Sequence, residues 1–167
     1  MNKSQRLNVL RIGLGVLILA NLFMIFSFSS QDAAESGLVS KGVSYTIARI
    51  FVADFEELPP TEQSQIIVSI HPYVRKLAHM AEFGLLGALT FSLLLTWKNR
   101  LSLQYAEALL AVLAVACIDE LSQGCSAGRA SQFTDVLIDL SGALLTCSLI
   151  LLIVILCRRH RMKGRFV

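Results

Sequence analysis

Four long apolar stretches constrain the fold more than any other feature of this sequence. They cover about residues 12–28, 77–97, 101–123 and 136–157. Each is close to the roughly 17–25 residues that an α-helix needs to cross a bilayer. With 54% hydrophobic and only 16% charged residues, the chain is also too apolar for a soluble domain of its length. The sequence therefore predicts an all-α, polytopic membrane protein, in which residues 1–167 form one domain with four transmembrane helices.

Lys and Arg are distributed unevenly over the two ends of these spans. Ten of the 15 lie in the N-terminal segment, the turn between the second and third spans, and the C-terminal tail. Four spans place these three segments on one side, which the positive-inside rule makes cytoplasmic. All of the 12 acids except Glu107 lie in the opposite half. We therefore expect a multi-pass protein of the cell membrane with both termini in the cytoplasm. The first span is expected to be retained, because residues 27–29 are a poor signal-peptide cleavage site.

The segment between the first two spans, residues 29–73, is predicted to form an outer helical cap. Over residues 39–51 the apolar side chains recur near the 3.6-residue period of a helix, while Lys41, Ser44 and Arg49 occupy the other face. This pattern indicates a short amphipathic helix in the outer membrane interface.

A second helical stretch of the cap is expected to start at Thr61. Pro72 is expected to open the second span as its first helical residue, a position that proline favours. The cap either covers the bundle passively or acts as a lid over a site, and the sequence favours neither reading strongly.

Seven ionisable residues interrupt the last three apolar stretches near their outer ends. They are Lys76, His79, Glu82, Asp119, Glu120, Asp135 and Asp139. Charged groups inside a bilayer are costly, usually face the bundle interior and mark functional sites. The alternative is a polar network that only fastens the helices together, but seven groups exceed what the adhesion of four helices requires. We therefore predict a polar pocket that opens outward.

Helical spacing brings the polar residues of the second span onto one face. His79 and Glu82 are three residues apart, and Lys76 precedes His79 by three. Arg75 lies four residues before His79 and about 10 Å above Glu82 at the helical rise. Glu82 is therefore predicted to be the deepest of the four.

The third and fourth spans contribute acids to the same end. Asp119 and Glu120 are adjacent and point about 100° apart, so only one of them is expected to face the centre fully. Both have helical spacing to Gln123, and Asp135 and Asp139 form an i, i+4 pair on the fourth span. Asp135 equally fits a helix-end charge that offsets the macrodipole.

Three further residues complete the sequence-based picture. Gly142 lets a neighbouring helix approach the fourth span closely. Arg129, in the loop before that span, is able to pair with a carboxylate or a phosphate. Asn21, within the first span, is interpreted as an interhelical hydrogen bond.

Five short motifs run through the chain in a fixed order. They are Ser-Ser-Gln at 29–31, Arg-Lys-Leu-Ala-His-Met-Ala-Glu-Phe at 75–83, Asp-Glu-Leu-Ser-Gln at 119–123, Gly-Arg-Ala-Ser-Gln-Phe-Thr-Asp at 128–135 and Asp-Val-Leu-Ile-Asp-Leu-Ser-Gly at 135–142. Together they resemble the VanZ-like family, small bacterial membrane proteins named after a member associated with low-level teicoplanin resistance. The resemblance covers about residues 7–156 and implies a role in the cell envelope linked to glycopeptide resistance. Many members carry Asn and others Asp at the position of Asp139.

The leading hypothesis is a VanZ-like membrane protein that binds a lipid or lipid-linked headgroup in the outward pocket. The residues predicted to bind the headgroup are Gln31, Arg75, Lys76, Asp119, Gln123, Arg129 and Asp135. The basic members of this set would meet phosphate. The expected partners are membrane lipids and a lipid-linked cell-wall precursor, and no nucleic-acid partner is expected.

Two other hypotheses stay open. The first is an intramembrane hydrolase or transferase, in which His79, Glu82, Glu120 and Asp139 are the catalytic or metal-binding candidates. Imidazole with carboxylates suits zinc, and an all-oxygen subset suits magnesium. Without a metal, Glu82 or Glu120 would be the general base. The second is a proton-coupled carrier, which the small size and the apolar inner halves of the spans disfavour.

Overall fold

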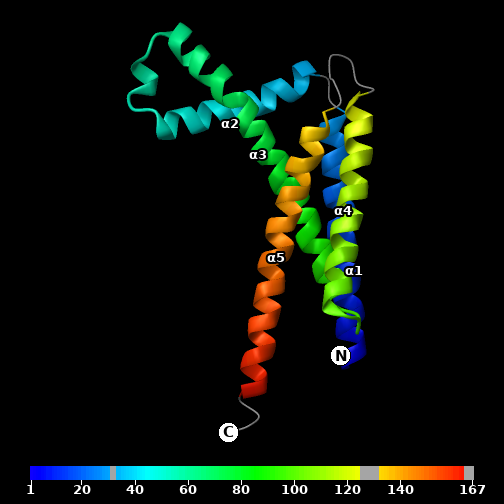
Figure 1. Ribbon diagram of the computed structural model, residues 1–167. Helices are drawn as coiled ribbons and strands as arrows, with labels where there is room; N and C mark the ends of the chain where they lie inside the picture. Colours follow the sequence, from blue (N-terminus) through cyan, green and yellow to red (C-terminus); the bar gives the residue numbers. More distant parts are fainter. Residues whose placement is uncertain (31–32, 125–131, 164–167) are drawn as a thin grey trace.

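The computed structural model describes residues 1–30, 33–124 and 132–163. These parts form helices and no strands (Figure 1). The elements are α1 (Lys3–Ser29), α2 (Ala33–Phe51), the 3-10 turn η1 (Phe55–Glu57), α3 (Pro60–Leu94), α4 (Leu101–Gly124) and α5 (Phe133–Lys163). Among them α1, α3, α4 and α5 are long and apolar enough to cross a membrane. The predicted all-α fold, with four long apolar helices and a further helical segment between the first two, is therefore confirmed.

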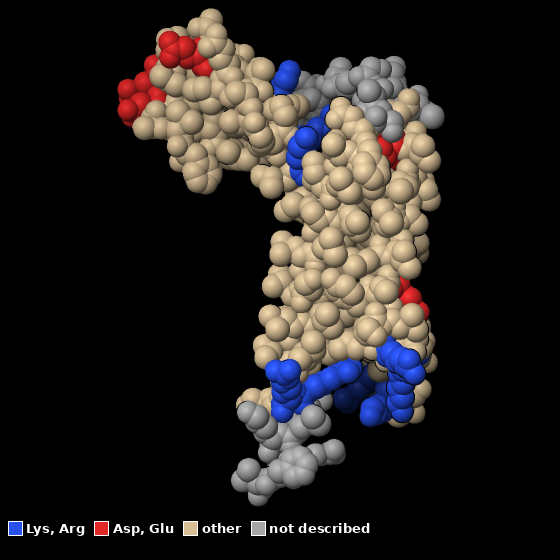
Figure 2. All heavy atoms as spheres, viewed as in Figure 1, with Lys and Arg blue, Asp and Glu red and all other residues tan. Residues whose placement is uncertain are grey.

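The four spanning helices form a bundle with two chemically different ends. One end holds the start of α1, the end of α5 and the turn from α3 to α4, and Lys and Arg gather there in Figure 2. We call it the basic end. The other end holds the last residues of α1 and α4 and the first residues of α5. We call it the acidic end, because His79 and most of the acids within the spans lie towards it.

The closest approach between helices is the crossing of α3 and α5. A Cβ added at Gly142 would overlap the carbonyl oxygen of Met80, and one added at Gly87 would lie 3.0 Å from Ala143. The Thr146 hydroxyl donates a hydrogen bond of 2.7 Å to the Gly84 carbonyl across the same crossing. Small residues let the two backbones meet, as predicted for Gly142.

A buried apolar layer closes the bundle below the acidic end. Phe83, Leu86, Val112 and Ala116 from α3 and α4 meet Ile25 of α1 in this layer. The layer separates the polar residues of the acidic end from the apolar half of the bundle beyond it.

The prediction that Pro72 opens the second span was wrong. The structure shows one continuous helix from Pro60 to Leu94 with Pro72 in its interior. Proline removes a donor, which leaves the carbonyl of Val68 without its helical partner. Pro72 and Val68 are both exposed, so that carbonyl can be satisfied from outside the helix. The second helical stretch predicted from Thr61 is therefore the first part of α3, and with α2 and η1 it forms a hairpin that extends sideways from the acidic end (Figure 1).

Candidate functional site

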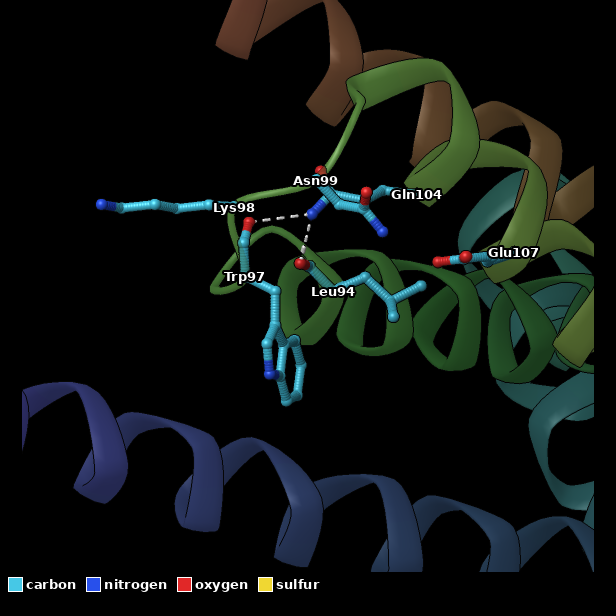
Figure 3. Close-up of a pocket in the computed structure, with 6 residues that line it drawn as sticks. All are labelled: Leu94, Trp97, Lys98, Asn99, Gln104 and Glu107. Carbon is cyan, nitrogen blue, oxygen red and sulfur yellow. Dashed lines mark hydrogen bonds between the residues drawn. The ribbon is translucent and has the colours of Figure 1, made fainter.

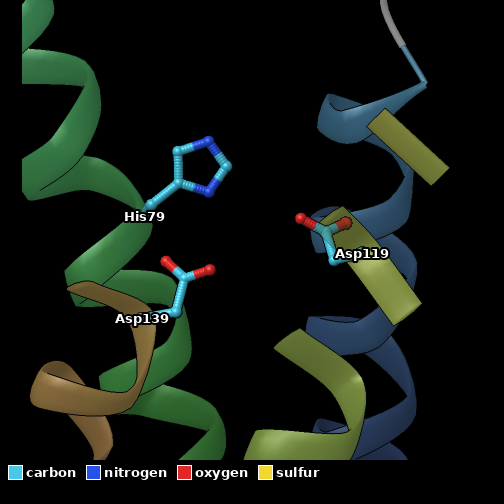
Figure 4. A group of neighbouring side chains, drawn as sticks. All are labelled: His79, Asp119 and Asp139. Carbon is cyan, nitrogen blue, oxygen red and sulfur yellow. The ribbon is translucent and has the colours of Figure 1, made fainter. Parts of the chain in front are cut away.

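Three side chains from three different helices converge near the acidic end. His79 of α3, Asp119 of α4 and Asp139 of α5 each offer one ligand atom, and these atoms all lie within 4.8 Å of one another. Figure 4 shows the imidazole and both carboxylates facing the same space between the helices. Asp119 is 0% exposed and Asp139 is 3% exposed, while His79 is half-buried. We call these three residues the triad.

The crossing of α3 and α5 sets the height of two triad members. Met80 packs against Gly142 at the crossing. His79 directly precedes Met80, and Asp139 lies one helical turn before Gly142. Both side chains therefore leave their helices at the same level, just on the acidic side of the crossing. Asp119 joins them because it continues the inward face of α4 beyond Ala116.

The hydrogen bonds of the triad leave two carboxylate oxygens unused. The Gln123 side-chain amide donates a bond of 2.7 Å to Oδ2 of Asp119, which orients that carboxylate. Among the described residues, Oδ1 of Asp119 and Oδ1 of Asp139 are buried without any hydrogen-bond partner. Buried polar atoms in folded proteins are nearly always paired. Two orphaned oxygens facing the same space therefore indicate that a further group belongs there.

The ion pair between Arg49 and Glu56, at 2.8 Å, lies in the hairpin and does not involve these acids. Buried carboxylates are strongly disfavoured unless they are paired or coordinate a metal. A bound cation, or a proton shared between the carboxylates, would satisfy both Asp119 and Asp139.

A pocket of about 370 Å³ lies far from the triad, at the basic end (Figure 3). It is lined by Leu94, Trp97, Lys98, Asn99, Gln104 and Glu107. Its polar wall is already used, because the Gln104 side chain donates bonds of 2.6 Å and 3.0 Å to the carbonyls of Leu94 and Trp97. This pocket is therefore a feature of the turn between α3 and α4, at the end of the bundle opposite the triad.

A model of the family described as VanZ/LLP1 matches residues 14–156, which is most of the chain. The chain belongs to the VanZ/LLP1 family. The matched region contains all three triad residues. The family resemblance predicted from the five motifs is thereby confirmed. No curated protein and no solved structure matches the chain.

The other acids predicted for the site lie around the triad of this VanZ/LLP1 protein. Glu120 is buried, and its Oε1 accepts a hydrogen bond from the backbone N–H of Gln132, so it ties the end of α4 to the start of α5. Glu82 is half-buried on α3, one turn below His79. Asp135 lies in the first turn of α5, where a carboxylate also offsets the helix dipole.

The predicted headgroup-binding residues are only partly covered by the described structure. Arg75 is half-buried and Lys76 is exposed, both about one turn outward from His79 on α3. Gln31 and Arg129 lie outside the described residues. The described structure therefore places Arg75 and Lys76 on the helix that carries His79, and headgroup binding by any of the predicted residues stays a prediction.

Sequence reasoning underestimated the inward face of α1. Asn21, Ile25 and Ser29 follow one another at intervals of four and are all buried. Asn21 is 3% exposed, and among the described residues neither atom of its side-chain amide has a hydrogen-bond partner. The interhelical hydrogen bond predicted for Asn21 is therefore not found in the described structure. The available signal was that the polar residues Asn21 and Ser29 lie eight positions apart, which places them on one face of the helix.

The donor set of the triad fits a divalent cation. One imidazole nitrogen and two carboxylate oxygens are a common ligand set for zinc, whereas magnesium prefers oxygen ligands alone. Three protein ligands also leave coordination positions open for water or a ligand. Gln123 would act on such a site from outside, by holding Asp119 in its orientation.

Proposed function

We propose that this VanZ/LLP1 protein binds a divalent cation at the triad and uses it to hold the phosphate of a lipid or lipid-linked headgroup. The acidic end faces the outside of the cell, and both termini lie in the cytoplasm. The observation that carries this proposal is the convergence of His79, Asp119 and Asp139 on one space, with two buried oxygens left unpaired.

A phosphate would not bind at buried carboxylates without a cation, because like charges repel in a poorly solvated site. A divalent cation on the triad reverses the local charge and presents open positions to phosphate oxygens. Arg75 and Lys76, one turn outward on the same helix, would then meet the remaining phosphate oxygens. The bound headgroup would therefore sit at the membrane surface, with the acyl or prenyl chains in the outer leaflet.

The cation is tested by elemental mass spectrometry of the purified protein after zinc is added and excess metal is removed. The wild-type protein should retain about one zinc per chain, as a single three-ligand site implies. The His79→Ala and Asp139→Asn proteins should retain none. Glu107→Gln is the matched control, because it removes a carboxylate at the other end of the bundle, and it should retain as much zinc as the wild type. A wild-type protein that binds no zinc, manganese or magnesium would overturn the proposal.

Headgroup binding is tested by mixing the same detergent-solubilised proteins with bacterial membrane lipids and purifying the proteins again. Phosphate-bearing lipids should co-purify with the zinc-loaded wild type and be released by a chelator. They should not co-purify with the Asp139→Asn protein. Equal lipid retention by both proteins would show that the lipids bind only to the apolar surface.

The open coordination positions also favour a second candidate, a metal-dependent hydrolase or transferase. A cation held by three side chains can activate a water molecule or stabilise charge that develops on a phosphate. Glu82, half-buried one turn below His79, would be the base that takes the proton from water. Mass spectrometry of lipid-linked substrates incubated with the wild-type and Glu82→Gln proteins would detect the reaction. Unchanged substrate in both samples would leave headgroup binding as the function.

The link to glycopeptide resistance is part of the proposal. Expression of the wild-type protein in a susceptible bacterium should raise the teicoplanin concentration that inhibits growth, because an occupied headgroup is less accessible to the antibiotic. The Asp139→Asn protein, expressed to the same level, should not. If the Asp139→Asn protein raised the inhibitory teicoplanin concentration as much as the wild type, resistance would not depend on the triad.

A further inference from the structure

The hairpin formed by α2, η1 and residues 60–72 of α3 is not used by the proposed function. It leaves the acidic end of the bundle sideways, so that α2 lies across the direction of the spans instead of continuing along it (Figure 1). The hairpin therefore lies beside the acidic end, outside the four-helix bundle.

The hairpin has its own core and is therefore a defined structural unit. Ala48 of α2 and Phe55 of η1 are 1% and 2% exposed. The rings of Tyr45 and Phe55 meet edge to face, with centroids 5.5 Å apart. The ion pair between Arg49 and Glu56 ties α2 to η1 on the surface. These contacts hold α2 in one rotation about its axis, so that its faces have fixed directions.

One face of α2 remains apolar and uncovered. Val43, Ile47 and Ile50 follow at intervals of four and three, which places them on one side of the helix. Ile50 and Phe51 are 69% and 81% exposed. Moving such side chains from water to an apolar environment is favourable. An apolar face of this kind, on a unit that already has its own core, indicates a partner that covers it.

The distribution of charge identifies a membrane surface as that partner. In Figure 2 the acids of the hairpin gather at its far tip, and no charged residue is visible on the underside that faces along the spans. The tip acids Glu56, Glu57 and Glu62 are exposed, away from the bundle. The basic residues Lys41 and Lys76, also exposed, lie on the helices that join the hairpin to the bundle.

Exposed apolar residues also continue along α3 from the hairpin into the part of the helix that is apolar enough to span a membrane. Tyr73 and Leu77, 70% and 59% exposed, carry the exposed apolar surface of α3 from the hairpin into the span. A protein partner would have to displace lipid along this line, whereas a bilayer covers both surfaces at once.

We propose that the hairpin lies in the headgroup interface of the leaflet at the acidic end, with the apolar face of α2 against the upper acyl chains and Lys41 and Lys76 at lipid phosphates. An interfacial helix of this type enters the headgroup and acyl boundary by about 5–10 Å. The tip acids stay in water, where they do not meet anionic headgroups. The hairpin thereby fixes the height of the bundle relative to that leaflet.

Tryptophan fluorescence in vesicles tests this position. The chain has a single tryptophan, Trp97, so Trp97→Phe provides a silent background. Ile50→Trp is the reporter on the apolar face, and Glu57→Trp is the matched control at the tip. The protein is placed in vesicles of phosphatidylethanolamine and phosphatidylglycerol, with bromine at different depths along the acyl chains.

The Ile50→Trp protein should be quenched by lipids brominated near the headgroup and protected from acrylamide in the water. The Glu57→Trp protein should show the opposite behaviour. Equal access of acrylamide to both reporters would overturn the proposal. Protection of the Ile50→Trp reporter without quenching by any brominated lipid would also overturn it and point to a protein partner.

A second measurement does not depend on an inserted tryptophan. In the otherwise wild-type protein, Ile50→Asp places a charge on the apolar face without touching the hairpin core or the triad. Amide hydrogen exchange of residues 41–58 in vesicles should accelerate in this variant, while exchange in α4 should be unchanged. Thr61→Asp, exposed at the tip beside Glu62, is the control and should leave exchange as in the wild type. Identical exchange in the Ile50→Asp and Thr61→Asp proteins would contradict a membrane-bound hairpin.

Discussion

The two ends of the bundle treat polar side chains in opposite ways. At the basic end, Arg11 donates bonds of 2.9 Å to the hydroxyl and the carbonyl of Thr96 and lies 4.5 Å from the centre of the Trp97 ring. The Gln104 side chain donates to two carbonyls at and just after the end of α3, those of Leu94 and Trp97. At the acidic end, oxygens of Asp119 and Asp139 are buried without a partner in the described structure.

This difference distinguishes polar residues that hold the helices together from polar residues that are available to bind a ligand. A polar group that finds its partners inside the protein ties helices together and has nothing left to offer a ligand. A buried group with an unused oxygen lowers the stability of the empty bundle, and it is expected only where a ligand completes it. We therefore expect substitutions at the basic end to change stability alone, and substitutions at the acidic end to change binding first.

Asp119→Asn is expected to have the largest effect. It removes a charged ligand, and zinc affinity should fall by more than about 100-fold, beyond the 10–100-fold loss typical of residues that only orient a ligand. Without metal, the same variant should unfold at an equal or higher temperature than the wild type, because one of several buried like charges is gone. Zinc titration and thermal unfolding with a chelator measure both effects. A destabilised metal-free variant would instead make Asp119 an adhesive residue like those of the basic end.

The next largest effect is expected from Gly142→Ala, at the crossing between the two ends. Its Cβ would meet the Met80 backbone, which cannot rotate away, so the free energy of unfolding should fall by about 1–3 kcal/mol. Zinc affinity should fall too, because the crossing holds His79 and Asp139 at one height. Gly15→Ala is the control, since nothing lies within 4 Å of an added Cβ there. Lower stability with unchanged zinc affinity would show that the crossing does not position the zinc ligands.

Two buried glutamines on α4 compare the ends directly. Gln123→Leu should lower zinc affinity by about 10–100-fold with little change in stability, because it frees Asp119 to reorient. Gln104→Leu should leave zinc affinity unchanged and reduce the free energy of unfolding by about 1–3 kcal/mol, since the Trp97 carbonyl loses its side-chain donor and the Leu94 carbonyl keeps only the backbone N–H of Trp97. Zinc titration and thermal unfolding measure both variants. If Gln104→Leu lowered zinc affinity and Gln123→Leu lowered only stability, the ligand-binding end would be the basic end.

Arg11→Met is expected to have the smallest effect. It keeps the apolar stem but removes the bonds to Thr96 and the contact with Trp97, which should cost about 1 kcal/mol of unfolding free energy. Zinc and lipid binding should stay at the wild-type level. Chemical denaturation in detergent is sensitive enough to detect this change, and any loss of zinc would argue against independent ends.

Much of the fold could be predicted because the decisive signals are local. Span length and apolar composition suffice to identify α1, α3, α4 and α5. Pro72 was misplaced because a proline is read as a boundary from its own chemistry, whereas its tolerance inside α3 depends on the exposure of Val68. The sequence also placed Glu120 among the metal-ligand candidates and Asp119 among the headgroup-binding residues. In the structure Asp119 is the one that lies with His79 and Asp139.

Sequence by itself determined the four spans, the segregation of basic and acidic residues, and the small residue that lets α3 and α5 meet. These properties follow from composition and from the helical period, which are set residue by residue. Only the tertiary structure decided which of two adjacent acids faces the centre and in which direction the hairpin leaves the bundle. The rotation of a helix about its axis depends on the helices packed against it. At Asp119 and Glu120 a rotation of about 100° exchanges one carboxylate for the other.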